Sequence, residues 1–200
     1  MRGKLIVIEG IDGAGKETQS KKLLEYLRGR KIPCELVSYP DYGNPIGDFI
    51  HDYLKGKHEL PADVQFLFYG LDMVKDRDRI LEWLRQGKTV IADRYITSAM
   101  AYQVLRGFSL ESALRFVDIF SLPKPDFIFY LKTSPETSMK RKKGEKRDLD
   151  RNERDLRLLE NVSKSYESLV RKQVWASWFV IDGEKSIEEV FGQIKRVLRI

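Results

Sequence analysis

A glycine-rich loop that directly follows an apolar run near the amino terminus constrains this chain most. The apolar run is Leu5–Glu9, and the loop reads Gly-Ile-Asp-Gly-Ala-Gly-Lys from Gly10 to Lys16. A strand, a turn of this spacing and a helix form a P-loop, in which backbone N–H groups face one concavity and the helix dipole adds positive potential. The loop predicts phosphate binding, with Lys16 placed to reach the β- and γ-phosphates. The expected nucleotide-binding residues are Gly10, Gly13, Ala14, Gly15, Lys16, Glu17 and Thr18.

The position after the lysine departs from the motif. A P-loop normally has Ser or Thr there, whose hydroxyl holds Mg²⁺, whereas this chain has Glu17, followed by Thr18. A carboxylate can also ligate Mg²⁺ through oxygen, but it brings negative charge towards the phosphates. The sequence therefore predicts phosphate binding and leaves two interpretations of Glu17, a metal ligand or an impairment of metal use.

Composition indicates one globular domain spanning residues 1–200. Apolar residues make up 42% of the chain and charged residues 33%, and no apolar run approaches the ~20 residues that a membrane span needs. Cys34 is the single cysteine, so no internal disulfide can form, which fits a reducing compartment. We expect Cys34 to be a core residue, and we expect a cytoplasmic protein without a membrane partner.

Short apolar runs alternate with helical stretches along the chain. The expected strands are Leu5–Glu9, Glu35–Tyr39, Thr89–Ala92, Phe127–Leu131 and Trp178–Ile181. The expected helices are Lys16–Arg28, Ala62–Arg85, a helix that Ser134-Pro135 opens, Leu156–Lys172 and Ser186–Leu198. This alternation predicts a doubly wound α/β fold with helices on both faces of a five-stranded parallel sheet. Ligands of such sheets bind beyond the carboxyl ends of the strands.

One of those strand ends carries Asp93-Arg94-Tyr95, directly after the third expected strand. A carboxylate at this place can hold Mg²⁺ directly or through water, so Asp93 joins Glu17 as a candidate metal ligand. The guanidinium of Arg94 can bind a phosphate through two parallel N–H bonds. A surface ion pair is the plainer interpretation, but the P-loop upstream favours a functional site.

The positive charge of the chain gathers in one segment. The net charge is +6, and six of the eight residues from Lys140 to Arg147 are basic. Such a run can be a solvated face, a nucleic-acid surface or a mobile lid that closes arginines over transferring phosphates. Because Gly144 interrupts the run and no aromatic residue is interleaved, as base stacking needs, we favour a lid at about residues 140–154 and expect no nucleic-acid partner.

Together these motifs resemble the thymidylate kinases, a family of P-loop nucleoside monophosphate kinases. Glu9–Lys16 and the run Asp93-Arg94-Tyr95 carry the likeness, and the second is the more specific. The other matching positions are Thr18-Gln19, Tyr39-Pro40, Ser98, Ala101-Tyr102-Gln103, Pro123–Asp126, Ile181–Gly183 and Ser186–Glu188, so the likeness covers essentially the whole chain. It implies phosphoryl transfer from ATP to dTMP, giving ADP and dTDP for dTTP synthesis, with Mg²⁺ as the cofactor. It also implies a homodimer packed through helices near Ser98–Arg106 and Ser109–Phe120.

The resemblance also implies roles for single residues. Asp12 resembles the carboxylate that binds the 3′-OH of the acceptor sugar, and Arg94 the arginine that binds the acceptor phosphate. Tyr102 resembles the tyrosine that packs on the sugar 2′ carbon and excludes ribonucleotides. The further dTMP-binding residues are Tyr39, Tyr42, Tyr69, Met73 and Ser98. Arg141 resembles the arginine that stacks on the donor adenine. Since Gly13 leaves no arginine in the P-loop, the catalytic lid cations would be Arg147 and Arg151, acting with Lys16 and Arg94.

Base recognition is where the chain departs from the family pattern. The family stacks an aromatic ring on thymine and places an arginine four residues later on the same helix. Counting back from Asp93 gives Tyr69 with Met73, and a shift by one gives Phe68 with Asp72, so neither register supplies the arginine. Core packing of Tyr69 and Met73 is the plainer interpretation. Asp41 also stands where a basic residue would commonly assist the acceptor phosphate.

These departures leave two alternatives to a dTMP kinase. One is a deoxynucleoside monophosphate kinase of different or relaxed base specificity. The other is a P-loop protein that binds nucleotide but is catalytically impaired, which Glu17 would mark. A guanine-specific GTPase is excluded, because Asn-Lys-x-Asp should follow a strand and Pro123–Asp126 instead precedes one.

Overall fold

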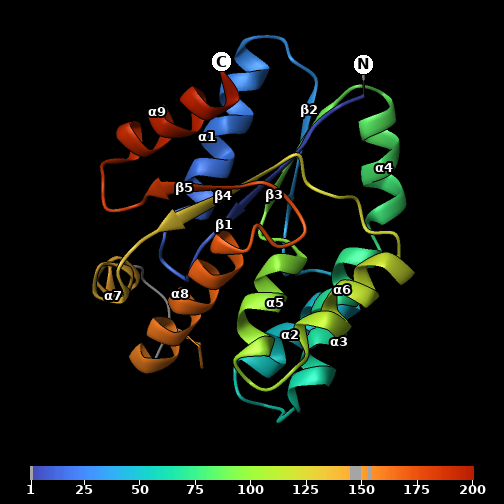
Figure 1. The fold of residues 1–200 in the computed structure, drawn as a ribbon, viewed down its shortest axis with the longest axis vertical. Coiled ribbons are helices and arrows are strands. Elements are labelled where there is room, and N and C mark those ends of the chain that lie inside the picture. Colours follow the sequence, from blue (N-terminus) through green and yellow to red (C-terminus); the bar gives the residue numbers. More distant parts are fainter. Residues whose placement is uncertain (1, 145–149, 153–154) are drawn as a thin grey trace.

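Five parallel strands form the centre of this computed structural model, which describes residues 2–144, 150–152 and 155–200 (Figure 1). The strands are β1 (Leu5–Glu9), β2 (Cys34–Ser38), β3 (Thr89–Asp93), β4 (Phe127–Lys132) and β5 (Trp178–Asp182). They lie in the order β2-β3-β1-β4-β5, all neighbours parallel. The doubly wound α/β prediction is confirmed, and each expected strand is present with its bounds shifted by at most one residue.

The helices follow the strands and cover both faces of the sheet. They are α1 (Lys16–Gly29), α2 (Pro45–Leu54), α3 (Ala62–Val74), α4 (Arg77–Arg85), α5 (Ile96–Val104), α6 (Leu110–Ile119), α7 (Pro135–Lys143), α8 (Leu156–Arg171) and α9 (Ile187–Leu198). Helices α1 and α9 pack together on one face, while α5 and α8 lie on the other, with α3 packed on α5 (Figure 1). Within the described residues, no helix is both long enough and apolar enough to span a bilayer.

Side-chain caps fix where several helices begin. Ser186 accepts from the N–H of Glu189, whose carboxylate accepts from Ser186 in return, which confirms the expected capping box. Ser134 accepts from Thr137 N at 3.2 Å with Pro135 in the first turn, as expected. Helix α2 was not expected, although Asn44 caps it and Pro45 opens it.

The long helix expected over Ala62–Arg85 is wrong, because two helices, α3 and α4, occupy this stretch. Neither glycine nor proline stands at the break, which falls at Lys75 and Asp76. Both side chains are held there by tertiary contacts instead: Lys75 Nζ lies 2.8 Å from Asp41 Oδ2, and Asp76 Oδ2 accepts from Tyr39 OH at 3.2 Å. Contacts with a loop distant in the sequence therefore override the local helical pattern.

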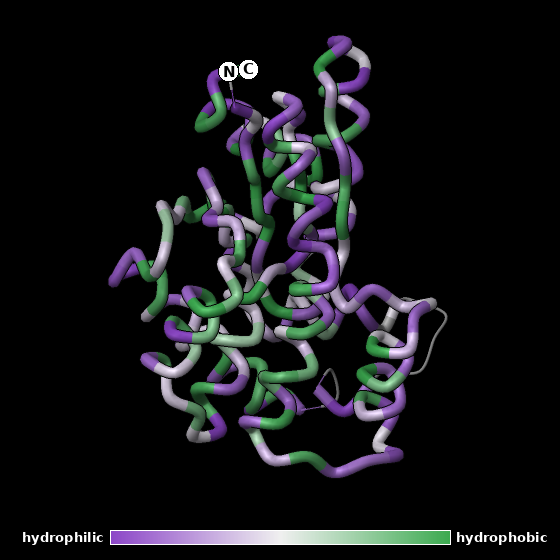
Figure 2. Tube along the Cα trace, turned by 90° about the vertical axis from the view of Figure 1, so that its right-hand side faces the viewer, coloured by the Kyte–Doolittle hydropathy of each residue, from purple (hydrophilic) through white to green (hydrophobic). Residues whose placement is uncertain are grey.

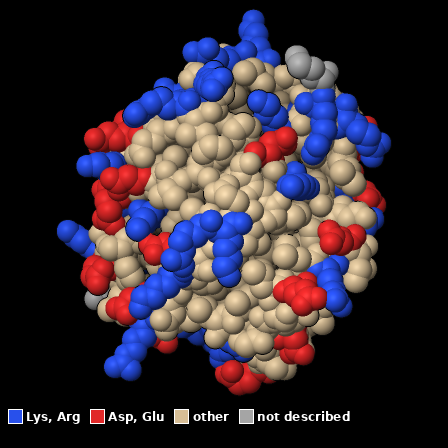
Figure 3. Space-filling model, viewed as in Figure 1, with Lys and Arg blue, Asp and Glu red and all other residues tan. Residues whose placement is uncertain are grey.

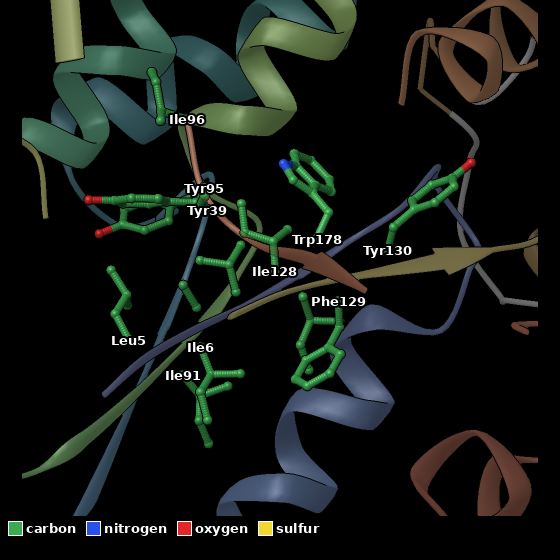
Figure 4. Close-up of a cluster of buried hydrophobic side chains, with 14 of the residues drawn as sticks. Leu5, Ile6, Tyr39, Ile91, Tyr95, Ile96, Ile128, Phe129, Tyr130 and Trp178 are labelled. Carbon is green, nitrogen blue, oxygen red and sulfur yellow. The ribbon is translucent and has the colours of Figure 1, made fainter. Parts of the chain in front are cut away.

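The apolar core lies between the sheet and its helices. All five residues of β1 are buried, as a strand covered on both faces requires. Aromatic side chains meet on one side of the sheet, where the rings of Tyr39 and Tyr95 lie 6.3 Å apart (Figure 4). The hydrophobic stretches run through the interior while the outer turns are mostly hydrophilic (Figure 2). Lys and Arg side chains share the face in Figure 3 with Asp and Glu, as the many ion pairs require.

Candidate active site

The P-loop joins the carboxyl end of β1 to α1. Gly13 and Gly15 have φ of +80° and +93°, a conformation that side chains with a Cβ rarely adopt. Gly15 is the N-cap of α1 and makes no side-chain cap bond, so the N–H groups of the first helical turn face the loop. Lys16 is buried, and its ammonium donates to the carbonyl of Ile11 at 2.8 Å. The loop therefore combines left-handed glycines, a helix start and a buried lysine.

The ammonium of Lys16 is buried, and burial disfavours its charged form. Burial and the nearby Arg94 lower the pKa of Lys16, Asp12 and Asp93 oppose the shift, and the net pKa is about 8. A buried ammonium of this kind is stabilised by a negatively charged ligand. The loop is therefore electrostatically suited to phosphates.

Helix α7 packs directly on the P-loop. A Cβ on Gly13 would lie 2.6 Å from the carbonyl oxygen of Ser138, so only glycine fits at this contact. The hydroxyl of Ser138, which is fully buried, donates to the carbonyl of Asp12. Sequence analysis missed Ser138. The contact ties the helix that begins the basic segment to the P-loop.

Asp12, Arg94 and Tyr102 form one cluster at the edge of the P-loop. Arg94 Nη2 pairs with Asp12 Oδ1, and Tyr102 OH donates to Asp12 Oδ2 at 3.0 Å. Arg94 Nη1 also donates to the carbonyl of Gly10 at 3.2 Å. Its backbone has φ of +67°, a conformation that costs a non-glycine residue about 1–2 kcal/mol. The neighbouring contacts therefore hold Arg94 in a strained position that aims its guanidinium at the loop.

Electrostatics keep this cluster charged. Burial raises the pKa of Asp12, but Arg94, Lys16 and the bond from Tyr102 outweigh it and lower this pKa to about 2. Burial likewise opposes the charge of Arg94, but Asp12 and the neighbouring Tyr102, Tyr166 and Glu9 together outweigh it, so the pKa of Arg94 lies well above its ordinary value. Asp12 and Arg94 are both ionised throughout the neutral range. A guanidinium has five N–H donors, which leaves capacity for a phosphate beside these contacts.

A buried carboxylate behind the cluster positions the start of α5. Glu9 is fully buried and accepts from Tyr95 N at 3.1 Å, Thr97 Oγ1 at 2.6 Å, Ser98 Oγ at 2.5 Å and Tyr166 OH at 2.9 Å. The N-cap of α5, Tyr95, makes no side-chain cap bond of its own, so Glu9 supplies the negative charge that a helix start favours. From the sequence, Glu9 was only part of the matching motif. The feature that could have indicated its role is a carboxylate at the end of an otherwise apolar strand.

A cavity of about 540 Å³ opens beside the cluster. All eight residues expected to bind dTMP line it: Asp12, Tyr39, Tyr42, Tyr69, Met73, Arg94, Ser98 and Tyr102. Of the two registers considered for base stacking, the structure brings Tyr69 and Met73 to the cavity. Phe68 instead stacks on Phe49, with ring centroids 4.2 Å apart.

Gln103 is a cavity residue whose role sequence analysis missed. It lies on α5 next to Tyr102 and is buried, and its Oε1 atom has no hydrogen-bond partner among the described residues. Buried polar atoms are nearly always satisfied, so an unsatisfied carbonyl beside a cavity is a candidate to accept a bond from a ligand N–H. Gln103 belongs to the Ala-Tyr-Gln motif, which was the available signal.

The two candidate metal ligands line the same cavity but differ in surroundings. Asp93 is buried, and burial raises its pKa, although Lys16 and Arg94 oppose the shift. The side chain of Glu17 is exposed and its carboxylate accepts from Lys21 Nζ at 2.6 Å. The described residues contain no group of three or more His, Cys, Asp or Glu that could hold a metal. One or two carboxylates suit Mg²⁺, which takes most of its ligands from phosphates and water.

Apart from Glu17, the residues expected to bind ATP do not line this cavity. Arg141 is exposed, and its Nη2 donates to the carbonyl of Gly183 at 2.9 Å, which joins α7 to the turn after β5. Thr18 is exposed on α1. Gly10, Ala14 and Gly15 contribute the loop backbone.

Only one of the two expected lid cations, Arg151, lies within the described residues. Arg147 lies outside the described residues. Arg151 pairs with Glu59 of the loop between α2 and α3, and its guanidinium lies 4.6 Å from the ring centroid of Tyr53. Arg151 does not line the cavity, whereas its neighbours Asp150 and Asn152 do. In this structure Arg151 therefore contacts the helices below the cavity rather than the P-loop.

Comparisons with known proteins find one family over nearly the whole chain. A family model described as thymidylate kinase matches residues 8–194. A thymidylate kinase of Homo sapiens is 33% identical over 196 residues, which cover 97% of this chain and 89% of the human protein. One from Dictyostelium discoideum is 32% identical, with coverage of 98% and 85%. Among solved structures, a thymidylate kinase from Candida albicans matches with a TM-score of 0.76 at 26% identity, covering 99% of this chain and 92% of that one.

Proposed function

We propose, from the premise that this chain belongs to the thymidylate kinase family, that it transfers the γ-phosphoryl group of ATP to dTMP, giving ADP and dTDP. The observation that carries the proposal is the cluster of Asp12, Arg94 and Tyr102, which links the P-loop to the adjacent cavity. A donor phosphate on the loop and an acceptor in the cavity would meet at this cluster. The acceptor phosphate is already ionised near neutral pH, so alignment and electrostatic stabilisation carry the reaction.

The acceptor side of the reaction follows from the same three residues. Arg94 binds and orients the acceptor phosphate. Asp12, kept ionised by its neighbours, accepts a bond from the 3′-OH of the sugar. Tyr102 packs against the 2′ carbon, where a ribose hydroxyl would have no room. Tyr69 stacks on the base, and Gln103 offers its unsatisfied carbonyl oxygen to a base N–H.

The donor side depends on the P-loop and the basic segment. The backbone of the loop and Lys16 bind the donor phosphates, and Arg141 stacks on the adenine. Asp93 would hold Mg²⁺, with Glu17 as a further oxygen ligand, and the ion would supply positive charge that offsets the negative charge of the donor phosphates. We propose that Arg147 and Arg151 come to the transferring group when residues 140–154 close as a lid, because Gly13 leaves the loop without an arginine.

The enzyme itself is best tested with a substrate panel. We expect dTMP to have the highest kcat/KM among dTMP, dUMP, dGMP, dCMP and dAMP when each is assayed with ATP and Mg²⁺. The solved relative from Candida albicans is described as having broad substrate specificity, so the panel also measures how far this chain shares that property. Binding of ATP without transfer to any monophosphate would contradict the proposal.

We also propose that residues 1–200 form one kinase domain that works as a cytoplasmic homodimer. Large apolar side chains remain exposed on α3 and at the end of α6, namely Leu67, Leu71, Ile119 and Phe120. Exposed apolar side chains of this kind suit an interface between two copies. Light scattering on the purified protein should give twice the 23.4 kDa mass of the chain, and the monomer mass would contradict the dimer.

A further inference from the structure

Lys75 binds three carboxylates at the break between α3 and α4. Its Nζ atom lies 2.8 Å from Asp41 Oδ2, 3.2 Å from Asp72 Oδ1 and 2.6 Å from Asp76 Oδ2. These carboxylates come from the loop between β2 and α2, from α3 and from the N-cap of α4. One ammonium therefore connects three separate elements.

Burial makes this cluster sensitive to the loss of its cation. The side chain of Asp72 is 1% exposed and that of Asp76 is 11% exposed. Burial raises the pKa of Asp72, while Lys75 opposes that shift. Burial lowers the pKa of Lys75, but its carboxylate partners outweigh this and raise it overall. Without Lys75, the carboxylates would repel one another at short range with little solvent to screen them.

The same carboxylates hold the loop after β2. Asp72 Oδ2 accepts from the backbone N–H of Asp41 at 2.9 Å, and Asp76 Oδ2 accepts from Tyr39 OH at 3.2 Å. The carbonyl of Asp41 is held as well, because it accepts from Asn44 Nδ2 and lies close against Gly47. The loop is thus held through its backbone and through two side chains.

This loop and α3 form two sides of the acceptor cavity. Tyr39, Pro40 and Tyr42 line it from the loop, while Tyr69 and Met73 line it from α3. The contacts of Lys75 therefore determine how far apart these two sides lie. Lys75 itself does not line the cavity, so it would act through its neighbours.

We infer that Lys75 is a positioning residue for the acceptor nucleotide, fixing the loop of residues 39–42 against α3 through Asp41, Asp72 and Asp76. This inference rests on the proposed function. It also explains why an acidic residue is tolerated at position 41, where the family pattern favours a basic one. The negative charge of Asp41 is compensated by Lys75, whose Nζ lies 2.8 Å from its carboxylate.

The test compares two cations of one cluster. Lys75→Met removes the cation that contacts all three carboxylates. Arg79→Met is the matched control, because Arg79 Nη2 pairs with Asp76 alone among the three, at 2.6 Å, and its side chain is 53% exposed. Asp41→Asn removes one charge at a half-exposed position and serves if Lys75→Met does not fold. KM for dTMP and KM for ATP are measured separately, with far-UV circular dichroism as a check of folding.

We expect Lys75→Met to raise KM for dTMP about tenfold, less than the roughly 10²-fold loss that a misplacement of about 1 Å can cause, with KM for ATP within about twofold. Lys75→Arg should restore most of the affinity, Asp41→Asn should raise KM for dTMP by a smaller factor, and Arg79→Met should leave KM for dTMP and KM for ATP near wild type.

Equal changes in KM for dTMP and KM for ATP, or a folded Lys75→Met with wild-type KM for dTMP, would overturn the inference. If only Asp41→Asn folds, a KM for dTMP equal to that of Arg79→Met would overturn it. A wild-type protein inactive on dTMP would instead overturn the proposed function.

Discussion

The acceptor half of the site and the donor half hold their charged groups in different ways. In the acceptor half, the side chains of Arg94 and Asp12 are only 15% and 20% exposed, and they are bonded to each other. In the donor half, the side chains of Glu17 and Lys21 are 73% and 61% exposed and pair with each other across one turn of α1. Buried, mutually fixed charges reorganise little when a ligand binds, whereas exposed pairs contribute little and are easily exchanged. The acceptor cluster is therefore built by the fold, as is the buried Lys16 of the P-loop, whereas the exposed pair of Glu17 and Lys21 can be exchanged when a donor nucleotide binds.

Replacing Arg94 should break the acceptor half outright. Arg94→Ala removes the phosphate-binding guanidinium and leaves Asp12 without its main partner, so we expect kcat/KM for dTMP to fall by about 10³-fold. Arg94→Lys keeps the charge but lacks the planar fork, and it should recover only part of the loss. Steady-state kinetics with circular dichroism would check both. Near wild-type turnover by folded Arg94→Ala would remove Arg94 from its assigned role.

The donor half should respond to pH through Lys16. The pKa of Lys16 is lowered from 10.5 to about 8, so the ammonium that binds phosphate is present below this pH and lost above it. Since kcat/KM reports the free enzyme, kcat/KM for ATP should be flat below pH 8 and then fall about tenfold for each further pH unit. The dissociation constant of dTMP should change much less over the same pH range. An ATP profile that stays flat to pH 10 would contradict this account of Lys16.

Two stacked tyrosines allow the hydrogen bonds around buried Glu9 to be compared with ordinary core packing. The rings of Tyr130 and Tyr166 lie 5.1 Å apart, but only Tyr166 OH reaches Glu9 and Ser98, whereas Tyr130 OH bonds with Ser163. Losing one bond to a buried carboxylate costs about 1–2 kcal/mol. Tyr166→Phe should lower kcat/KM for dTMP about fivefold, while Tyr130→Phe should leave it unchanged. Equal effects of the two substitutions would show that the network does not position α5.

Glu17 should give the smallest change, because its carboxylate is exposed and already paired with Lys21. Glu17→Ser restores the hydroxyl that the motif expects. We expect activity to rise by about twofold, or the Mg²⁺ concentration for half-maximal activity to fall by a similar factor. A magnesium titration of both proteins would measure this. A loss of activity would instead identify the glutamate as an integral metal ligand.

Local signals were sufficient for the sheet and the P-loop. Continuous apolar runs located every strand, since a parallel strand is buried on both faces. The capping box at Ser186 and the proline after Ser134 marked two helix starts. The residues around the cavity came from motifs at the strand ends, where the fold must gather them.

Contacts between distant segments were beyond the reach of those signals. The break at Lys75 depends on Asp41 and Tyr39, more than thirty residues earlier. The role of Glu9 depends on Tyr166, which is 157 residues away in sequence. The choice between Tyr69 and Phe68 required knowing which helix face meets the cavity, because both side chains occur in one apolar helix. Side-chain contacts between residues that are distant in the sequence decide each of these points.

Calorimetric titration of dTMP into the nucleotide-free protein would test the preformed acceptor half most directly. Arg115→Ala is a suitable charge-matched control, because Arg115 is exposed on α6 and pairs only with Glu111 among the described residues. We expect dTMP to bind without ATP, about 100-fold more weakly to Arg94→Ala, and within about twofold of wild type to Arg115→Ala. Binding of dTMP that appears only after an ATP analogue is added, or equal affinities of the two variants, would contradict a site built by the fold.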